Sequence, residues 1–249
     1  MVDKLVDSEA NARRVANVEN CFGGEVLAAP NRVLVGEGVL QKQCRKQLKP
    51  RQFFLFNDVI VYGTIIIHRK KYNNMHLLPL DEVRIVALDD IGPERQNGWQ
   101  IISPRKSFNV YAANSSEKSE WIQHLNTCIE GCQRKSAKKI TTELAPAWIP
   151  DDAATHCMIC AKVKFSPIAR KHHCRRCGKI VCNNCSTKRL LLASQSSEPV
   201  RVCDPCFAEA SAKRISVGDV KPDSSGDEED SGDDSNANRQ EQEPAQFFS

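Results

Sequence analysis

Apolar and polar residues alternate in short runs between residues 33 and 111. Runs rich in Val, Ile, Leu and Phe, such as 52–56 and 59–62, are separated by turn-forming pairs such as Asn57-Asp58 and Asn97-Gly98. Branched and aromatic residues favour extended backbone, whereas Asn, Asp and Gly favour tight turns. The spacing predicts an antiparallel β-barrel or sandwich built from short strands.

A helical pattern follows the last of these runs. Asn114 or Ser115 can cap a helix, and Gly131 is placed to end it. Between them, the apolar residues that fall on one helical stripe are Trp121, Leu125, Cys128 and Ile129. We expect this helix to close the β region.

The pattern divides the chain into five parts and predicts an α+β fold with more than one domain. The N-terminal segment, residues 1–34, places Val15 and Val18 on one face and predicts one amphipathic helix. The other parts are a β domain capped by a C-terminal helix over 35–131, a basic linker over 132–147, a cysteine-rich module over 148–213 and a disordered acidic tail over 214–249. The tail holds too few apolar residues to offset the entropy of ordering.

Composition agrees with a chain that folds and does not cross a bilayer. Of its 249 residues, 41% are hydrophobic and 27% are charged, which is ordinary for a globular protein. The longest apolar stretch, 59–67, is far shorter than the roughly 20 residues that a membrane-spanning helix needs. The first residues mix both charges and lack the apolar region of a signal peptide, so we expect a cytoplasmic protein with reduced cysteines.

Charge is segregated along the chain. The formal net charge is +4, yet residues 219–243 hold ten acidic side chains against Lys221 and Arg239. The preceding part is therefore strongly basic, which favours an anionic partner. One hypothesis is that the acidic tail competes with this partner for the basic surface, and a solvated tail without that role is the simpler alternative.

Cysteine spacing is the strongest chemical signal. Eight of the 12 cysteines form four Cys-x-x-Cys pairs, at 157/160, 174/177, 182/185 and 203/206. In a reducing compartment such pairs are typical of zinc sites, and two pairs complete one tetrahedral site. We predict two structural Zn²⁺ ions, and the spacing leaves sequential and cross-braced pairing both open. The cysteines without an assigned role are Cys21, Cys44, Cys128 and Cys132.

Three motifs surround the cysteine pairs. They are Trp148-Ile149-Pro150-Asp151, the basic run over 170–178, and Arg201-Val202-Cys203. They match W-x-x-D, R-(R/K)-HHCR-x-C-G and R-V-C, so residues 148–213 resemble a FYVE zinc finger. The resemblance implies a cross-braced module that binds phosphatidylinositol 3-phosphate. It implies that one zinc is held by Cys157, Cys160, Cys182 and Cys185, and the other by Cys174, Cys177, Cys203 and Cys206.

The chemistry of the basic run suits a phosphorylated inositol. Arginine forks bind phosphate oxygens, lysine adds a point charge, histidine donates, and a carboxylate accepts from a hydroxyl. We assign the headgroup site to Asp151, Arg170, Lys171, His172, His173, Arg175 and Arg201. Arg176 is expected to be a solvated charge. If a protonated His172 or His173 contacts phosphate, affinity should rise as the pH falls from about 7.5 to about 6.

An apolar segment, residues 165–169, lies between the first two cysteine pairs and beside the basic run. In FYVE fingers the matching loop inserts into the bilayer, which makes Pro167 and Ile168 the expected wedge. Shallow apolar insertion and attraction to anionic lipid together give reversible binding. A buried hairpin corner is the alternative.

The β domain carries basic residues of its own. Lys42, Lys49 and Arg51, together with Trp121 in the closing helix, resemble the pattern of pleckstrin homology (PH) domains. Lys49 and Arg51 are two positions apart on one expected strand and share a face. We expect the three basic residues to form a second phosphoinositide site of unassigned lipid preference, and an exposed basic hairpin is the alternative.

A PH domain followed by a FYVE finger in so short a chain resembles the Phafin family. The resemblance implies a peripheral adaptor of early endosome and lysosome membranes that acts in endosome traffic, autophagy and apoptosis with endosomal protein partners. We expect no enzymatic activity, because the sequence holds no catalytic triad or glycine-rich phosphate loop. The alternatives are a RING-like zinc module acting as a ubiquitin ligase, and a nucleic-acid binder, for which the sequence offers no aromatic stacking platform.

Overall fold

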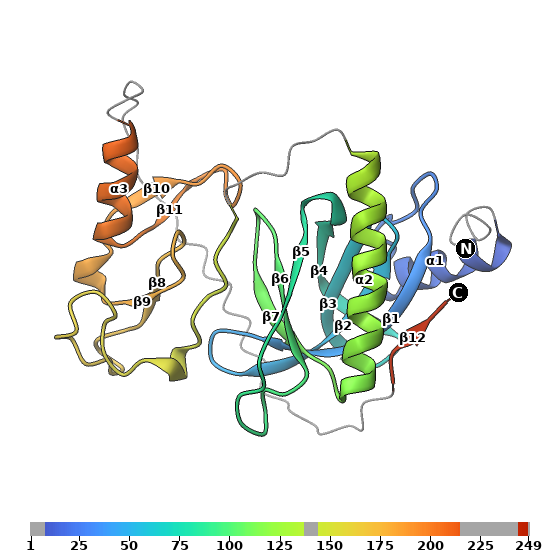
Figure 1. Cartoon of the computed structure of the whole chain (residues 1–249), viewed down its shortest axis with the longest axis horizontal. Helices are drawn as coiled ribbons and strands as arrows, with labels where there is room; N and C mark the ends of the chain where they lie inside the picture. Colours follow the sequence, from blue (N-terminus) through green and yellow to red (C-terminus); the bar gives the residue numbers. More distant parts are fainter. Residues whose placement is uncertain (1–7, 137–143, 215–243, 249) are drawn as a thin grey trace.

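The structure, a computed structural model, describes residues 8–136, 144–214 and 244–248. Two modules lie beside one another in Figure 1: a β module (residues 8–136) and a cysteine module (residues 144–214). An antiparallel sheet with a closing helix, followed by a small cysteine-rich unit, confirms the predicted fold class.

Seven antiparallel strands of the β module form the main sheet. They are β1 (Leu34–Gln43), β2 (Leu48–Phe56), β3 (Val59–Ile67), β4 (Lys71–Pro79), β5 (Arg84–Ala87), β6 (Gly98–Ile102) and β7 (Phe108–Tyr111). Their spatial order is β4-β3-β2-β1-β7-β6-β5, and a short helical turn, η2 (Leu80–Glu82), connects β4 to β5. β1 joins the two halves of the sheet: it pairs with β2 along its length but with β7 only at Gln41 and Lys42.

Helix α2 (Ser115–Lys135) closes one face of this sheet. It begins at Asn114, whose side chain accepts a hydrogen bond from the N–H of Glu117. Trp121 and Leu125 on its apolar stripe are buried against Trp99 and other residues of the sheet. The predicted stripe therefore forms the main core of the β module.

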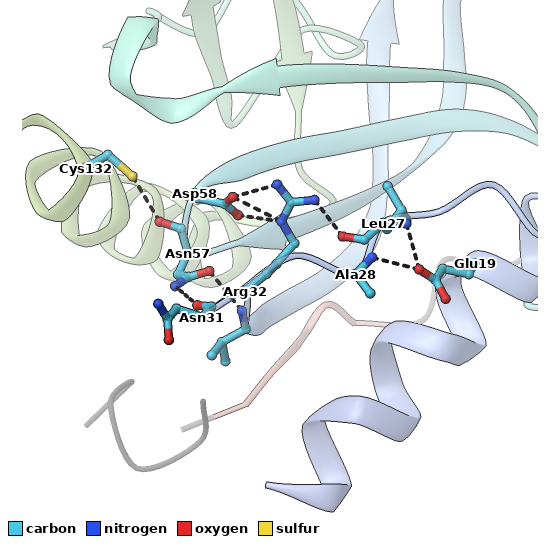
Figure 2. Close-up of polar contacts among 9 residues, drawn as sticks. Glu19, Leu27, Ala28, Asn31, Arg32, Asn57, Asp58 and Cys132 are labelled. Carbon is cyan, nitrogen blue, oxygen red and sulfur yellow. Dashed lines mark hydrogen bonds and ion pairs between the residues drawn. The ribbon is translucent and has the colours of Figure 1, made fainter. Parts of the chain in front are cut away.

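The end of α2 differs from the sequence prediction. Gly131 was expected to stop the helix, but α2 continues to Lys135. A glycine inside a helix costs only about 1 kcal/mol relative to alanine. The next residue, Cys132, packs against the core and its thiol donates a hydrogen bond of 3.1 Å to the carbonyl of Asn57, as Figure 2 shows. These tertiary contacts outweigh the local preference to end the helix.

Helix α1 (Glu9–Cys21) packs on the opposite face of the sheet. The side chain of Ser8 caps it by accepting a hydrogen bond from the N–H of Asn11. Val15, Val18 and several aromatic residues of the sheet form a second core there. The helix expected in the N-terminal segment thus exists and is part of the β module.

A polar network fastens the segment after α1 to the sheet (Figure 2). Nη2 of Arg32 lies 2.6 Å from Oδ2 of Asp58, and its Nη1 donates to the carbonyl of Leu27 at 2.6 Å. The carboxylate of Glu19 accepts hydrogen bonds of 2.7 Å from the N–H groups of Leu27 and Ala28. These contacts fix how α1 lies against the strands.

The cysteine module contains little regular structure. Its elements are η3 (Asp151–Ala153), β8 (His172–His173), β9 (Ile180–Val181), η4 (Asn183–Cys185), β10 (Arg189–Leu191), β11 (Pro199–Arg201) and α3 (Asp204–Arg214). Two short hairpins, β8-β9 and β10-β11, hold the cysteines around a small core that includes Val181, Leu190 and Val202. None of the described helices of the chain is both long enough and apolar enough to span a membrane.

Part of the predicted linker packs against the β module. The N–H of Ala145 donates to the carbonyl of Ser103 at 3.0 Å, and the hydroxyl of Ser107 donates to the carbonyl of Ala145 at 2.5 Å. Ala147 forms a parallel bridge with Ser107. Residues 137–143 of the linker lie outside the described residues.

The prediction of a disordered tail is wrong at the end of the chain. Strand β12 (Gln246–Phe247) pairs with β1, with Phe247 opposite Gly36 and Gln246 opposite Glu37. The backbone edge of β1 that β7 leaves unpaired is the reason a short strand finds partners there. The acidic residues 219–243, and the competition expected of them, lie outside the described residues.

Candidate zinc centres and headgroup site

The eight cysteines of the Cys-x-x-Cys pairs gather in two groups of four. Within each group the Sγ atoms all lie within 4.8 Å of one another. The groups are Cys157, Cys160, Cys182 and Cys185, and Cys174, Cys177, Cys203 and Cys206. The first pair therefore lies with the third and the second with the fourth, which is the cross-braced arrangement that the FYVE resemblance implied.

The donor sets fit zinc. A Zn–S bond of about 2.3 Å places two sulfur ligands of a tetrahedral site about 3.8 Å apart. The Sγ atoms of Cys177 and Cys203 are 3.8 Å apart. Four thiolates at such distances repel one another, and a divalent cation between them removes the repulsion. The module therefore holds two structural Zn²⁺ ions, each with four protein ligands and no position left for a substrate.

Backbone N–H groups favour the thiolate form of the ligands. The N–H of Cys203 donates a hydrogen bond of 3.2 Å to Sγ of Cys174. Hydrogen bonds from the backbone, first of all that of Val163, lower the pKa of the Cys160 thiol to about 6. Because zinc binds the thiolate, these hydrogen bonds prepare the sulfur atoms for the metal.

His173 on β8 orients the W-x-x-D segment. Its ring stacks on Trp148 with centroids 4.7 Å apart and an interplanar angle of 8°. Its Nε2 lies 2.7 Å from the carbonyl oxygen of Ile149, and its side chain is 2% exposed. Burial lowers the pKa of His173, although the hydrogen bond to Ile149 opposes this. The structure therefore buries His173 beneath the W-x-x-D segment and leaves His172 half-buried, and the pH dependence expected of these histidines stays a prediction.

Two cations of the basic run lie around the W-x-x-D segment. The guanidinium of Arg175 stands over the ring of Trp148, 4.1 Å from its centroid. The ammonium of Lys171 donates a hydrogen bond to the carbonyl of Asp151. Arg170 is exposed at the edge of the same run. The structure thus brings the basic motif and the W-x-x-D motif together.

The R-V-C motif lies next to the basic run. The N–H of Arg175 donates to the carbonyl of Arg201 at 2.9 Å, while Nη1 of Arg201 donates to the carbonyl of Ser186 at 2.7 Å. Arg176 differs from its expected role as a solvated charge. Its guanidinium forms a two-pronged ion pair with Glu209 of α3, with both N···O distances 3.0 Å. Its role is to fasten α3 to the module.

Asp151 lies where the two modules meet. Its Oδ2 is 3.4 Å from Nε of Arg45, in the loop between β1 and β2, and its Oδ1 is buried without a hydrogen-bond partner among the described residues. The next residue, Asp152, pairs with Arg95 of the β module at 2.7 Å. Sequence reasoning missed both ion pairs, because partners so far apart along the chain leave no local signal.

Pro167 and Ile168 form an exposed tip. Ile168 is 95% exposed, and the N–H of Ser166 donates to the carbonyl of Ala169 at 3.1 Å, which closes a tight turn. Phe165, at the base of the turn, packs against the cysteine core. The alternative of a buried hairpin corner is wrong.

The three basic residues of the β module lie at one end of the β1-β2 hairpin. Lys42 stands opposite Lys49, and Arg51 stands opposite Leu40. Opposite residues of an antiparallel pair point to the same face, and so do residues two apart. Lys42 is 8% exposed and its Nζ lies 4.5 Å from the ring centroid of Phe108. The register therefore gathers the three cations on one face beside the loop that holds Arg45.

Comparisons with known proteins give both modules a family. Residues 34–130 match the model of the PH domain, and residues 147–212 match that of the FYVE zinc finger. Pleckstrin homology domain-containing family F member 2 of Gallus gallus is 57% identical over 209 residues, which are 83% of this chain and 84% of that protein. The Homo sapiens member 2 is 56% identical over 214 residues, 85% of this chain and 86% of that protein. The Homo sapiens member 1 is 47% identical over 216 residues, 86% of this chain and 77% of that protein.

The RING-like alternative is not favoured, because the cysteine module matches the FYVE model. A PH domain joined to a FYVE finger is typical of phosphoinositide-binding adaptors that associate peripherally with membranes. Since both domains and the relatives that span most of the chain agree, the chain belongs to the Phafin family, pleckstrin homology domain-containing family F.

Proposed function

We propose that the protein is a non-enzymatic adaptor recruited by its FYVE finger to membranes rich in phosphatidylinositol 3-phosphate. The observation that carries this proposal is the Oδ1 atom of Asp151, which is buried and has no hydrogen-bond partner among the described residues. Nε2 of His173 lies 3.8 Å from it, beyond hydrogen-bond distance, and the ammonium of Lys171 donates to the backbone carbonyl of the same aspartate. A buried acceptor without a donor costs about 1–3 kcal/mol. An inositol hydroxyl supplies that donor, while the cations of the basic run donate hydrogen bonds to the oxygens of a ring phosphate.

The exposed tip gives the finger a second hold on the membrane. Ile168 presents nearly its whole side chain to solvent, next to the basic run. Burying an isoleucine side chain contributes about 1.5–3 kcal/mol. Headgroup recognition and insertion of Pro167 and Ile168 then act together, so that stable binding requires both the correct lipid and a bilayer.

The PH domain is proposed as a second lipid-binding site. Lys42, Lys49 and Arg51 lie on one face of the β1-β2 hairpin, and two strand neighbours can bind one phosphate. Other phosphoinositides are possible ligands of this site. Two sites on one chain raise the overall affinity by effective concentration even where each binds weakly.

The cellular part of the proposal rests on the family. Recruitment to early endosomes and lysosomes, with roles in endosome traffic, autophagy and apoptosis, is what Phafin membership implies. Endosomal protein partners belong to the same expectation, and no nucleic acid is proposed as a partner.

The proposal is tested by sedimentation of the zinc-loaded chain with phosphatidylcholine and phosphatidylserine vesicles, with and without phosphatidylinositol 3-phosphate. Arg175→Ala is expected to lower the selective binding at least tenfold, because a hydrogen bond to a charged group contributes about 1.5–3 kcal/mol. Lys49→Ala/Arg51→Ala is expected to weaken binding less. Arg105→Ala, which removes an exposed arginine of the PH domain, is the matched control.

Equal binding to all anionic vesicles, or equal losses for Arg175→Ala and Arg105→Ala, would contradict the headgroup assignment. Vesicles with other singly phosphorylated inositols in the same assay report whether the site prefers the 3-phosphate. If only Lys49→Ala/Arg51→Ala lowers binding to phosphatidylinositol 3-phosphate, the PH domain rather than the FYVE finger would be the site that binds this lipid.

A further inference from the structure

The C-terminal strand β12 occupies a groove of the PH domain. The ring of Phe247 lies 5.2 Å from that of Trp121 and stacks on that of His124, with centroids 4.3 Å apart and an interplanar angle of 11°. Ala245 also packs on this core. The groove therefore has an aromatic wall on α2 and a floor on β1, and Figure 1 shows β12 beside both elements.

Glycine on β1 makes room for this segment. A Cβ added at Gly36 would lie 2.4 Å from Cδ1 of Phe247, and its three nearest atoms would all belong to Phe247 and Gln246. A Cβ at Gly38 would lie 2.8 Å from Cβ of Ala245. A side chain at Gly36 would therefore collide with the C-terminal segment, and the nearest atoms that it meets all belong to that segment.

The segment also has an outer face. Gln246 and Phe248 line a cavity of about 460 Å³ between α1 and the sheet. The guanidinium of Arg14 lies 4.1 Å from the ring centroid of Phe248, and the N–H of Phe248 donates to the carbonyl of Val35 at 2.7 Å. Successive residues thus alternate between groove and cavity, as an extended strand requires.

The groove is a sheet edge rather than a gap in the core. On this side of β1, strand β7 pairs only at Gln41 and Lys42, so the edge near Gly36 offers backbone groups to any extended segment. Strand β12 contributes two paired residues to the sheet and a few partly buried side chains to a core that α2 and the other strands already form. Strand addition to such an edge is a common mode of peptide recognition, with pockets for alternate side chains providing specificity.

We propose that this groove is a peptide-docking site, which binds an extended segment of a partner protein with a small residue two positions before an aromatic residue, in competition with the chain's own C-terminus. Ala245 and Phe247 are the template for that chemistry: the small residue fits over Gly38, and the aromatic ring fits between Gly36 and the wall of Trp121 and His124.

The docking groove is separate from the proposed lipid sites. It lies at the start of β1, whereas Lys42 and the loop that holds Arg45 lie at its end. The six residue steps along β1 from Gly36 to Lys42 correspond to about 20 Å. A partner segment can therefore dock while the opposite end of the hairpin faces a membrane.

The test uses a fluorescein-labelled peptide of residues 241–249 and fluorescence anisotropy, without lipid. The receptors are the full chain, Phe247→Ala, and a chain that lacks residues 244–249. In the full chain the tethered C-terminus competes at high effective concentration. We expect the peptide to bind the other two receptors at least tenfold more tightly than the full chain.

Two variants address the groove itself. Gly36→Ala in the Phe247→Ala chain is expected to abolish peptide binding, because the added methyl group takes the place of the peptide ring. Gly131→Ala is the matched control and is expected to change nothing, because an added Cβ at this helical glycine meets no atom outside the helix's own backbone within 4 Å. A labelled peptide carrying Phe247→Ala is expected not to bind.

Three outcomes would overturn the proposal. The first is that the peptide shows no saturable binding to Phe247→Ala or to the chain that lacks residues 244–249, although both receptors unfold cooperatively on heating and are therefore folded. The second is equal binding to the full chain, to Phe247→Ala and to the Gly36→Ala variant. The third is a dimeric full chain that becomes monomeric on Phe247→Ala in light scattering, which would assign the groove to a second copy.

Discussion

Arg45 of the PH domain and Asp151 of the FYVE finger join the two domains at their proposed lipid sites. Nε of Arg45 lies 3.4 Å from Oδ2 of Asp151, and the N–H of Asp151 donates to the carbonyl of Arg45 at 2.8 Å. Arg45 lies in the loop that follows Lys42 and precedes Lys49. The two proposed headgroup sites are therefore neighbours, and the loop that carries one of them contacts the carboxylate assigned to the other.

Asp151→Ala is expected to lower affinity for phosphatidylinositol 3-phosphate by about 10-fold to 100-fold, because a hydrogen bond that involves a charged group contributes about 1.5–3 kcal/mol. Vesicle sedimentation measures the effect. Asp152→Ala is the matched control: it removes the same charge one residue later, where the exposed carboxylate pairs with Arg95 of the PH domain. Similar losses for the two variants would mean that the ion pairs between the two domains, rather than a hydrogen bond from Asp151 to the headgroup, govern binding.

Zinc removal is expected to unfold the FYVE finger and leave the PH domain folded. The ligands make up much of the finger's core, whereas none of them contributes to the core around Trp99 and Trp121. Cys174→Ser should reduce the zinc content measured by mass spectrometry and abolish vesicle binding. Cys128→Ser, at a buried cysteine of the PH domain, should keep the full zinc content. Full zinc content in Cys174→Ser would contradict the ligand assignment.

The zinc groups could be predicted because the ligands are recognisable from the spacing of the cysteines along the chain. A Cys-x-x-Cys pair supplies half of a site whatever the surrounding fold, and the neighbouring motifs supplied the pairing through the family resemblance. The residues of the proposed headgroup site lie in the same motifs, and their assignment stays a prediction. The buried position of His173 was not evident, since a titratable side chain next to a ligand suggests exposure until its stacking on Trp148 is seen.

Contacts between distant segments could not be predicted. The pair of Arg45 and Asp151 depends on how the two domains pack, which no periodicity encodes. Strand β12 follows an acidic stretch and is too short for alternation to be recognised, and its place is determined by Gly36 and the open edge of β1. At Gly131, local helix propensity gave the wrong end because Cys132 makes a tertiary contact.

Ile168→Asp is expected to weaken binding to vesicles that contain phosphatidylinositol 3-phosphate by about 10-fold to 100-fold, since insertion of the side chain contributes about 1.5–3 kcal/mol. Binding to the soluble inositol headgroup should not change, because the residue is 95% exposed and supports no core. Calorimetry with the headgroup and sedimentation with vesicles separate the two effects. Val26→Asp, at an 80% exposed apolar residue of the other domain, is the control. Equal losses in both assays would show that Ile168 acts on the headgroup site instead.

Docking of the C-terminal peptide is expected to weaken as the pH falls from about 7.5 to about 5.5. His124 stacks on Phe247, and burial lowers its pKa below the usual value of about 6.5, although Glu120 on the same helix opposes this shift. The docked state therefore takes up fewer protons than the undocked state, and protonation of His124 favours release. Burial raises the pKa of Glu117, which faces the same groove, so the measurement compares His124→Phe with the unchanged histidine in the Phe247→Ala receptor. His124→Phe keeps an aromatic wall and should remove the weakening at low pH. A Glu117 pKa that is raised by docking acts in the opposite direction, because protonation of that carboxyl then favours the docked state. An identical profile for both receptors would show that His124 does not cause the pH dependence.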